Sequence, residues 1–336
     1  MMHRTRKGYI NIMDDKDTAI RTVRSGETIK PRSTRTFNDR LMKVLRTVNF
    51  LSGKSLDESD LAKHRRNVER AGRLTAPRAN ITVTAFTVGD LPCEKVTPEY
   101  AHNPQYAILY AHGGGYISGG LNYARILASK MATATGFSVY TFAYRLAPEH
   151  PYPAAIDDGM MVWEHLTESR YAPGHIFIAG DSAGGNLALC MIQRLLSEKR
   201  PVPAGVLLFS PWTDMTGTST TYESNRDIDP ILSGDYVMSA AAAYTGNAGS
   251  PDDPVFSPLF GDFKGFPPAF IMAGRNEILL DDSVQLRSAI LEAGGRAVLD
   301  IEENGFHVYQ QLPINIAERA MKRLASHVSS EVYGDE

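Results

Sequence analysis

The chain has 336 residues, of which 43% are hydrophobic and 22% charged, and its formal net charge is −3 at pH 7. This composition is typical of a folded globular protein and excludes the collagen-like, disordered and coiled-coil classes. Two cysteines, Cys93 and Cys190, exclude a disulfide framework, and no run of 18 apolar residues predicts a spanning helix. Because no apolar segment follows the basic N-terminus, we expect a cytoplasmic protein.

Short apolar runs alternate with helical patterns along the chain, which is typical of βαβ units and a mostly parallel sheet. The predicted strands are Ile81–Val88, Cys93–Thr97, Ala107–His112, Ser138–Tyr144, His175–Ala179, Gly205–Ser210, Ala269–Ala273 and Ala297–Glu302. The predicted helices are Phe37–Leu51, Asp57–Gly72, Asn122–Thr135, Pro153–Ser169, Ala183–Lys199, Asp235–Thr245, Ser283–Ala293 and Leu312–His327.

Two segments fall outside this alternation. Residues 1–55 are basic, and the first 50 of them carry 12 Lys or Arg against 5 Asp or Glu. A basic arm can contact nucleic acid or a membrane, but a solvated terminus is the commoner case, so we expect neither partner. Residues 215–265 separate two predicted strands and are rich in Ser, Thr, Asp, Pro and Gly. A connection of that length in a compact domain indicates an active-site lid.

A serine lies in a predicted strand-to-helix turn with the sequence Gly180-Asp-Ser-Ala-Gly-Gly185. Small residues on both sides allow the strand and the helix to approach, and the turn projects the Ser182 hydroxyl above the sheet. The pentapeptide alone is a weak signal, since an ordinary glycine turn has the same composition. Its position between a strand and a helix predicts a nucleophile.

A second glycine-rich loop, His112-Gly-Gly-Gly-Tyr116, follows the predicted strand Ala107–His112. Consecutive glycines let backbone N–H groups face a developing oxyanion without side chains between them. A flexible connector is the alternative, whereas the dinucleotide-binding pattern fails because Ser118 stands where its last glycine is required.

A serine nucleophile needs a base and an orienting acid. His307 follows the last predicted strand, at the edge where sites of open α/β sheets form. The acid is expected after the preceding strand, where Glu277, Asp281 and Asp282 all qualify. We favour Glu277, because the two aspartates are more simply explained as a cap and a first-turn acid of the following helix.

These motifs together resemble the hormone-sensitive-lipase-like esterases of the α/β-hydrolase fold. Further similarities are Tyr144-Arg-Leu-Ala-Pro-Glu-His-Pro151, Ser210-Pro-Trp-Thr-Asp214 and Ser257-Pro-Leu259, in the same order. The resemblance implies an eight-stranded, mostly parallel sheet flanked by helices, with a helical cap. It places the cap in residues 1–55 and 215–265 and the catalytic core in residues 56–214 and 266–336. Most members carry Asp where this chain has Glu277.

The resemblance also implies Ser182 as nucleophile, His307 as base and an oxyanion hole formed by the N–H groups of Gly114, Gly115 and Ala183. Candidate substrate-pocket residues are Tyr116, Asp181 and Trp212, with the helix Asp235–Thr245 as a roof.

The expected reaction is hydrolysis of short- to medium-chain carboxylic esters through an acyl-enzyme, and it requires no metal or organic cofactor. The expected partner is a small ester, and a homodimer is allowed for. A lactonase or amidase would use the same residues, and a non-catalytic ligand-binding relative is the alternative from another class.

Overall fold

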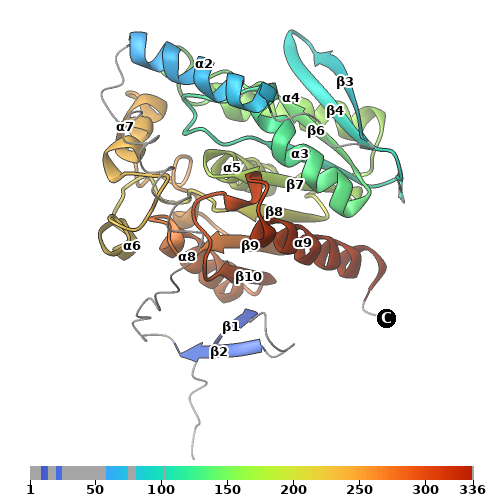
Figure 1. The fold of residues 1–336 in the computed structure, drawn as a ribbon. Coiled ribbons are helices and arrows are strands. Elements are labelled where there is room, and N and C mark those ends of the chain that lie inside the picture. Colours follow the sequence, from blue (N-terminus) through green and yellow to red (C-terminus); the bar gives the residue numbers. More distant parts are fainter. Residues whose placement is uncertain (1–8, 14–19, 25–57, 75–80, 102, 335–336) are drawn as a thin grey trace, which may run out of the picture.

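The computed structural model describes residues 9–13, 20–24, 58–74, 81–101 and 103–334. Eight strands form one sheet in the order β10-β9-β8-β7-β5-β6-β4-β3 (Figure 1). All neighbours from β10 to β6 are parallel, while β4 is antiparallel to both β6 and β3. The predicted eight-stranded, mostly parallel sheet is therefore confirmed.

All eight predicted strands are present. Their bounds are β3 Ile81–Val88, β4 Leu91–Pro98, β5 Ala107–Ala111, β6 Ser138–Phe142, β7 Ile176–Asp181, β8 Gly205–Phe209, β9 Ala269–Gly274 and β10 Ala297–Glu302. The central strands β5, β7, β8 and β9 are buried at every position, as strands covered on both faces must be.

Helices cover both faces of this sheet (Figure 1). The helices are α2 Glu58–Leu74, α3 Leu121–Thr135, α4 Ala154–Ser169, α5 Ala183–Ser197, α6 Thr220–Ser224, α7 Gly234–Thr245, α8 Leu280–Glu292 and α9 Asn315–Tyr333. Short 3₁₀ turns lie at η1 Pro173–His175, η2 Pro258–Phe260 and η3 Tyr309–Gln311. Helices α3 and α9 contribute to one apolar core cluster, and α4, α5 and α8 contribute to the other.

Strand β7 shows how alternation divides the core. Ile176 and Ile178 belong to the cluster on the α5 side, whereas Phe177 and Ala179 belong to the cluster on the α3 side. Successive side chains of a strand point to opposite faces, so a continuous apolar run supplies both layers. The two layers fix β7 at the centre of the sheet, directly before the Ser182 turn.

The structure differs from the sequence-based prediction at both ends of the chain. Near the N-terminus, Tyr9–Met13 (β1) and Ile20–Arg24 (β2) form an antiparallel pair that the sequence pattern did not predict. The predicted helix Phe37–Leu51 lies outside the described residues. At the C-terminus, α9 begins at Asn315 rather than Leu312, after Pro313, and continues to Tyr333. A proline does not donate the backbone hydrogen bond of a helix interior, so it delays the start.

The insertion between β8 and β9 has structure of its own, namely α6, α7 and η2. Helix α2 packs against α3, and in Figure 1 both α2 and α7 lie at the end of the molecule where the glycine-rich loops meet. These elements cover the carboxyl edge of the sheet, where the candidate residues gather.

Candidate active site

Ser182 occupies the tight turn between β7 and α5. Its backbone has φ 53° and ψ −121°, a strained conformation that folded proteins retain mainly at functional positions. The turn requires glycine on both sides: a Cβ added at Gly180 would lie 2.1 Å from the carbonyl oxygen of Gly184. A Cβ added at Gly184 would lie 2.1 Å from the carbonyl oxygen of Ala111. The close approach of β7, β5 and α5 thus fixes the Ser182 side chain at the N-terminal end of a helix.

The glycine loop after β5 lies beside this turn. Gly114 and Gly115 have φ values of 110° and 66°, and a Cβ at Gly114 would lie 2.3 Å from the carbonyl oxygen of Ser118. Only glycine fits this path without strain. Both glycines line the same cavity as Ser182. Ala183, the first residue of α5, has an N–H that no carbonyl of its own helix can accept.

Asp181 holds the glycine loop from below. Its Oδ1 accepts hydrogen bonds from the N–H of Gly113 at 2.8 Å and from the hydroxyl of Tyr110 at 2.5 Å. Its Oδ2 accepts a hydrogen bond from the hydroxyl of Tyr123 at 3.0 Å. Burial raises the pKa of the Asp181 carboxyl above its ordinary value, and these hydrogen bonds oppose that rise. Asp181 is fully buried and lies outside the cavity lining, although the sequence suggested that it faces the substrate.

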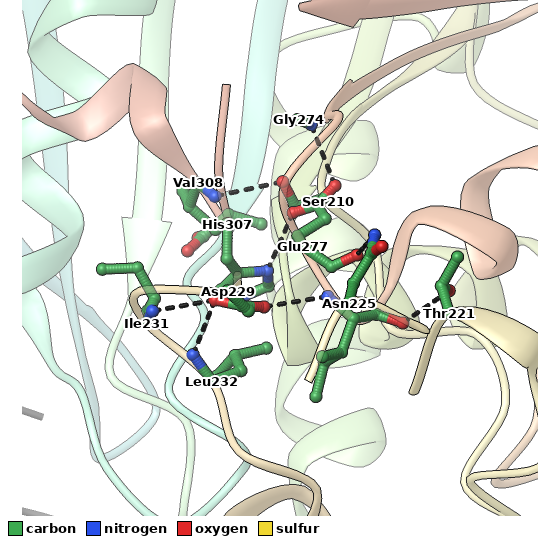
Figure 2. A network of polar contacts seen from close by, with 12 residues as sticks. Ser210, Thr221, Asn225, Asp229, Ile231, Leu232, Gly274, Glu277, His307 and Val308 are labelled. Atoms are coloured by element: carbon green, nitrogen blue, oxygen red, sulfur yellow. Dashed lines mark hydrogen bonds and ion pairs between the residues drawn. The ribbon is translucent and has the colours of Figure 1, made fainter. Parts of the chain in front are cut away.

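His307 and Glu277 form a buried pair (Figure 2). The Oε2 atom of Glu277 lies 3.2 Å from Nδ1 of His307, and its Oε1 accepts the N–H of Gly274 at 3.0 Å. Gly274 ends β9, and a Cβ there would lie 2.3 Å from the backbone nitrogen of Phe306. The turn carrying Glu277 and the loop carrying His307 therefore pack against each other at the ends of adjacent parallel strands.

The two other candidate acids point elsewhere. Asp282 is fully buried, and its Oδ2 accepts the N–H groups of Thr213 at 2.7 Å and Asp214 at 3.0 Å. The Oδ2 of Asp281 accepts the N–H of Thr221 at 3.2 Å. Both belong to the first turn of α8, as expected, but their hydrogen bonds fasten the insertion after β8 rather than capping the helix. Burial raises the pKa of Asp282 to about 7.

A cavity of about 780 Å³ joins these parts. Its lining includes Ser182, His307, Gly114, Gly115 and Trp212. Helix α2 contributes His64 and Val68, and the segment from Arg226 to Ala240 contributes most of the opposite wall. The two elements that lie over the carboxyl edge of the sheet thus enclose the space above Ser182.

Tyr116 lies outside this lining, contrary to its predicted place in the pocket. Its ring stacks on that of Tyr244 with centroids 3.7 Å apart, and its hydroxyl donates to Oδ1 of Asn186 at 2.7 Å. The ring is completely buried, because α7 covers it on one side and α5 on the other. Of the three predicted pocket residues, Trp212 lines the cavity and Tyr116 and Asp181 support its walls.

One acidic residue of this site was not predicted from the sequence. Asp229 lies in the insertion, is only 6% exposed and lines the cavity together with Ser182 and His307. Burial raises its pKa to about 6, and the charge of His307 lowers it. The only local signal is an Asp-Pro dipeptide in a segment predicted to be a lid, and that signal is common in turns.

Two searches of the described residues bear on other classes of site. Within residues 9–13, 20–24, 58–74, 81–101 and 103–334, no group of three or more His, Cys, Asp or Glu side chains is arranged to hold a metal ion. None of the helices in this part of the chain has the length and hydropathy that crossing a bilayer requires.

Known proteins resemble this chain in both sequence and fold. A family model described as the alpha/beta hydrolase fold matches residues 108–311. An esterase from Acinetobacter venetianus is 40% identical over 186 residues, which are 55% of this chain and 61% of that protein. An acetyl-hydrolase from Streptomyces hygroscopicus is 33% identical over 241 residues, which are 72% of this chain and 78% of that protein.

Solved structures agree with these matches. An esterase from the bacterial hormone-sensitive lipase family superposes with a TM-score of 0.82 at 30% identity, over 89% of this chain and 100% of that one. The esterase EstE5, soaked with p-nitrophenyl butyrate, superposes with a TM-score of 0.79 at 32% identity, over 88% of this chain and 98% of that one. The chain therefore belongs to the α/β-hydrolase fold family, in its bacterial hormone-sensitive-lipase-like branch of carboxylesterases.

Proposed function

We propose that this protein hydrolyses carboxylic esters with Ser182 as nucleophile, His307 as general base and Glu277 as the acid that orients His307. The observation that carries the proposal is the convergence of Ser182 and the buried His307–Glu277 pair on one cavity lined by Gly114 and Gly115. These residues come from four separate segments of the chain, and serine acyl transfer requires this set of groups.

In the first step, Nε2 of His307 takes the proton of the Ser182 hydroxyl while Oγ attacks the ester carbonyl carbon. The carbonyl oxygen becomes an oxyanion, and the N–H groups of Gly114, Gly115 and Ala183 are the proposed donors. The N–H of Gly113 already donates to Asp181, so it fixes the loop rather than serving the substrate. Each donor of this kind is worth about 10²–10³-fold in kcat in well-studied hydrolases.

In the second half, the carbon–oxygen bond of the ester breaks and the alcohol leaves with the proton from His307. Water then enters, gives a proton to Nε2 and attacks the acyl carbon, and the carboxylic acid leaves as Ser182 regains its proton. Glu277 accepts the hydrogen bond from Nδ1 throughout, which keeps the tautomer that leaves Nε2 free.

The cap that we propose consists of residues 215–265 together with α2, while residues before α2 keep their predicted place in it. A cavity of about 780 Å³, walled by Val68, Ile231, Leu232 and Leu312 among others, supports a preference for short to medium acyl chains. The acetyl-hydrolase and esterase names of the relatives favour the same class. Cytoplasmic location and a homodimer remain predictions.

The test is hydrolysis of p-nitrophenyl butyrate by the wild-type protein and by Ser182→Ala. The variant is expected to lose at least 10³-fold in kcat and to resist labelling by a fluorophosphonate probe, because Ser182 is the acylated group. Ser169→Ala, at an exposed serine far from the cavity lining, is the control and is expected to match wild type. Retained turnover in Ser182→Ala would refute the assignment, and faster turnover of lactones or anilides than of esters would favour the lactonase or amidase alternative.

A further inference from the structure

Asp229 is the buried carboxylate of the cavity for which the mechanism above has no role. It belongs to the insertion between β8 and β9, and it lies next to His307 in Figure 2. The charge of His307 is among the influences on its pKa, so the two side chains interact across the cavity wall. A carboxylate that is 6% exposed needs strong compensation for its lost hydration.

That compensation comes from three backbone donors. Oδ1 accepts the N–H groups of Ile231 at 2.8 Å and Leu232 at 2.9 Å, which close a turn within the insertion. Oδ2 accepts the N–H of Ile278 at 2.8 Å, which belongs to the turn after β9. One carboxylate therefore joins the insertion to the peptide that directly follows Glu277 (Figure 2).

Two neighbours of Asp229 hold the same peptide. Nδ2 of Asn225 donates to the carbonyl oxygen of Glu277 at 2.9 Å, and the hydroxyl of Thr221 donates to the carbonyl oxygen of Ile278 at 2.7 Å. All three side chains come from the insertion, and Asp229 alone among these three carries a charge. Hydrogen bonds to Thr221 and Asn225 can position the turn, but they cannot stabilise a positive charge on His307.

We infer that Asp229 is a positioning residue for the proposed Ser182–His307 chemistry, which ties the insertion to the Glu277 turn and places a second negative charge beside the imidazolium formed in the reaction. This inference rests on the proposed function. The imidazolium exists only after His307 has taken the serine proton, so an adjacent carboxylate stabilises that state more than the resting enzyme. Burial raises the pKa of Asp229 to about 6, so the carboxylate is ionised at pH 8.

Other charged groups surround His307 and do not replace Asp229. Glu277 is hydrogen bonded to Nδ1, and Asp181, at the end of β7, interacts with His307 through its charge. The remaining titratable groups that line the cavity come from α2, the insertion and α7 and are His64, Arg226, Asp227 and Asp235, besides Tyr123 and Tyr236. A change confined to Asp229 leaves all of these in place.

The test compares Asp229→Asn with Thr221→Val for hydrolysis of p-nitrophenyl butyrate from pH 5 to 9. Asn keeps an acceptor for Ile231 and Leu232 but removes the charge, whereas Val removes one hydrogen bond to the same turn without changing any charge. For Asp229→Asn we expect kcat to fall about 10- to 100-fold with KM changed less than about threefold, and the acidic limb of kcat/KM to move to lower pH by about half a unit or more. Loss of a nearby negative charge makes protonation of the imidazole less favourable, which gives this direction.

Thr221→Val is expected to leave the acidic limb where it is in wild type. Asp229→Ser also removes the charge with a smaller side chain, so whichever of the two neutral variants folds must show the shifted limb, while Asp229→Glu must not. A neutral variant whose limb coincides with that of wild type would overturn the inference, even if its kcat were low. If Ser182→Ala kept its activity, the proposed function itself would fail, and that outcome is separate from the position of the limb.

Discussion

Glu277 contacts His307 through one carboxylate oxygen and the end of β9 through the other. The Oε2–Nδ1 distance is 3.2 Å, and Oε1 lies 3.0 Å from the backbone nitrogen of Gly274. The glutamate is completely buried, so its side chain is held at both oxygens with no access to water. Its extra methylene, compared with the aspartate of most relatives, is accommodated because the carboxylate folds back onto the strand from which its turn leaves.

Replacement of Glu277 by Gln tests this arrangement. The amide oxygen can still accept the N–H of Gly274, but an amide NH₂ then faces Nδ1 and favours the tautomer that cannot take a proton at Nε2. We expect kcat for p-nitrophenyl butyrate to fall about 10²–10⁴-fold while the protein stays folded. Asp281→Asn is the matched control, and it is expected to stay within about threefold of wild type. The reverse order of effects would identify Asp281 as the orienting acid.

The glycine loop can be tested at Gly114. With φ at 110° and a Cβ that would lie 2.3 Å from the carbonyl oxygen of Ser118, Gly114→Ala must displace the loop and its N–H donors. We expect a loss of about 10²-fold or more in kcat. Gly174→Ala is the control, because an added Cβ there meets nothing within 4 Å, and its free energy of unfolding should stay within about 0.5 kcal/mol of wild type. Near-normal kcat in Gly114→Ala would remove this loop from the proposed oxyanion hole.

Helix α2 is attached to the core through Arg65. The Arg65 side chain donates to the carbonyl oxygens of Ile117 and Ala147, both at 2.7 Å, and to both oxygens of Glu149 at 2.8 and 2.7 Å. We expect Arg65→Met to lower the free energy of local opening of α2 by about 1–3 kcal/mol, since two carbonyls lose their donor. Hydrogen exchange of the α2 amides measures this. Arg194→Met, which removes only exposed ion pairs, is expected to change stability by less than about 1 kcal/mol.

The same attachment has a pH dependence with a defined sign. The hydrogen bonds from Arg65 lower the pKa of Glu149 from 4.5 to about 2. A lowered pKa in the folded state means that the contribution is complete above about pH 4.5 and is lost as the pH falls toward 2. Exchange protection of α2, corrected for intrinsic rates, should therefore fall over this range in wild type and change less in Glu149→Gln. Equal pH dependence in both proteins would contradict the prediction.

Asp282 gives the opposite sign. Burial raises its pKa from 3.8 to about 7, so the folded state binds a proton more readily than the unfolded state. The contribution of this group to stability is greatest below about pH 4 and decreases as the pH rises toward 7. Asn can keep an acceptor for Thr213 and Asp214 and donate to the hydroxyl of Ser219, which lies 3.2 Å from Oδ1 in wild type.

Asp282→Asn is therefore expected to be more stable than wild type at pH 8, by about 1–3 kcal/mol. The advantage should shrink as the pH falls toward 4. Urea unfolding of both proteins across pH 4 to 8 measures the difference, and the subtraction removes groups that titrate identically in both. An advantage that did not change with pH would show that Asp282 does not titrate in this range.

Much of the core was predictable from local pattern. The strands Ile81–Val88 and Ala297–Glu302 have the bounds that alternation and apolar runs predicted, and β5, β7, β8 and β9 differ by a residue or two. Buried strands and amphipathic helices carry their signal within a few residues, so a single segment is enough to identify them. The β1–β2 pair carried no comparable signal.

The sequence by itself determined the βαβ order, the two glycine-rich turns and a histidine after the last strand, because each depends on residue types that are adjacent in the chain. Only the tertiary structure decided that Glu277 rather than Asp281 or Asp282 contacts His307, that Tyr116 and Asp181 lie behind the cavity wall, and that Asp229 lines it. Those outcomes depend on how the insertion packs against turns more than 40 residues away, where burial and backbone hydrogen bonds choose among carboxylates that look equivalent along the chain.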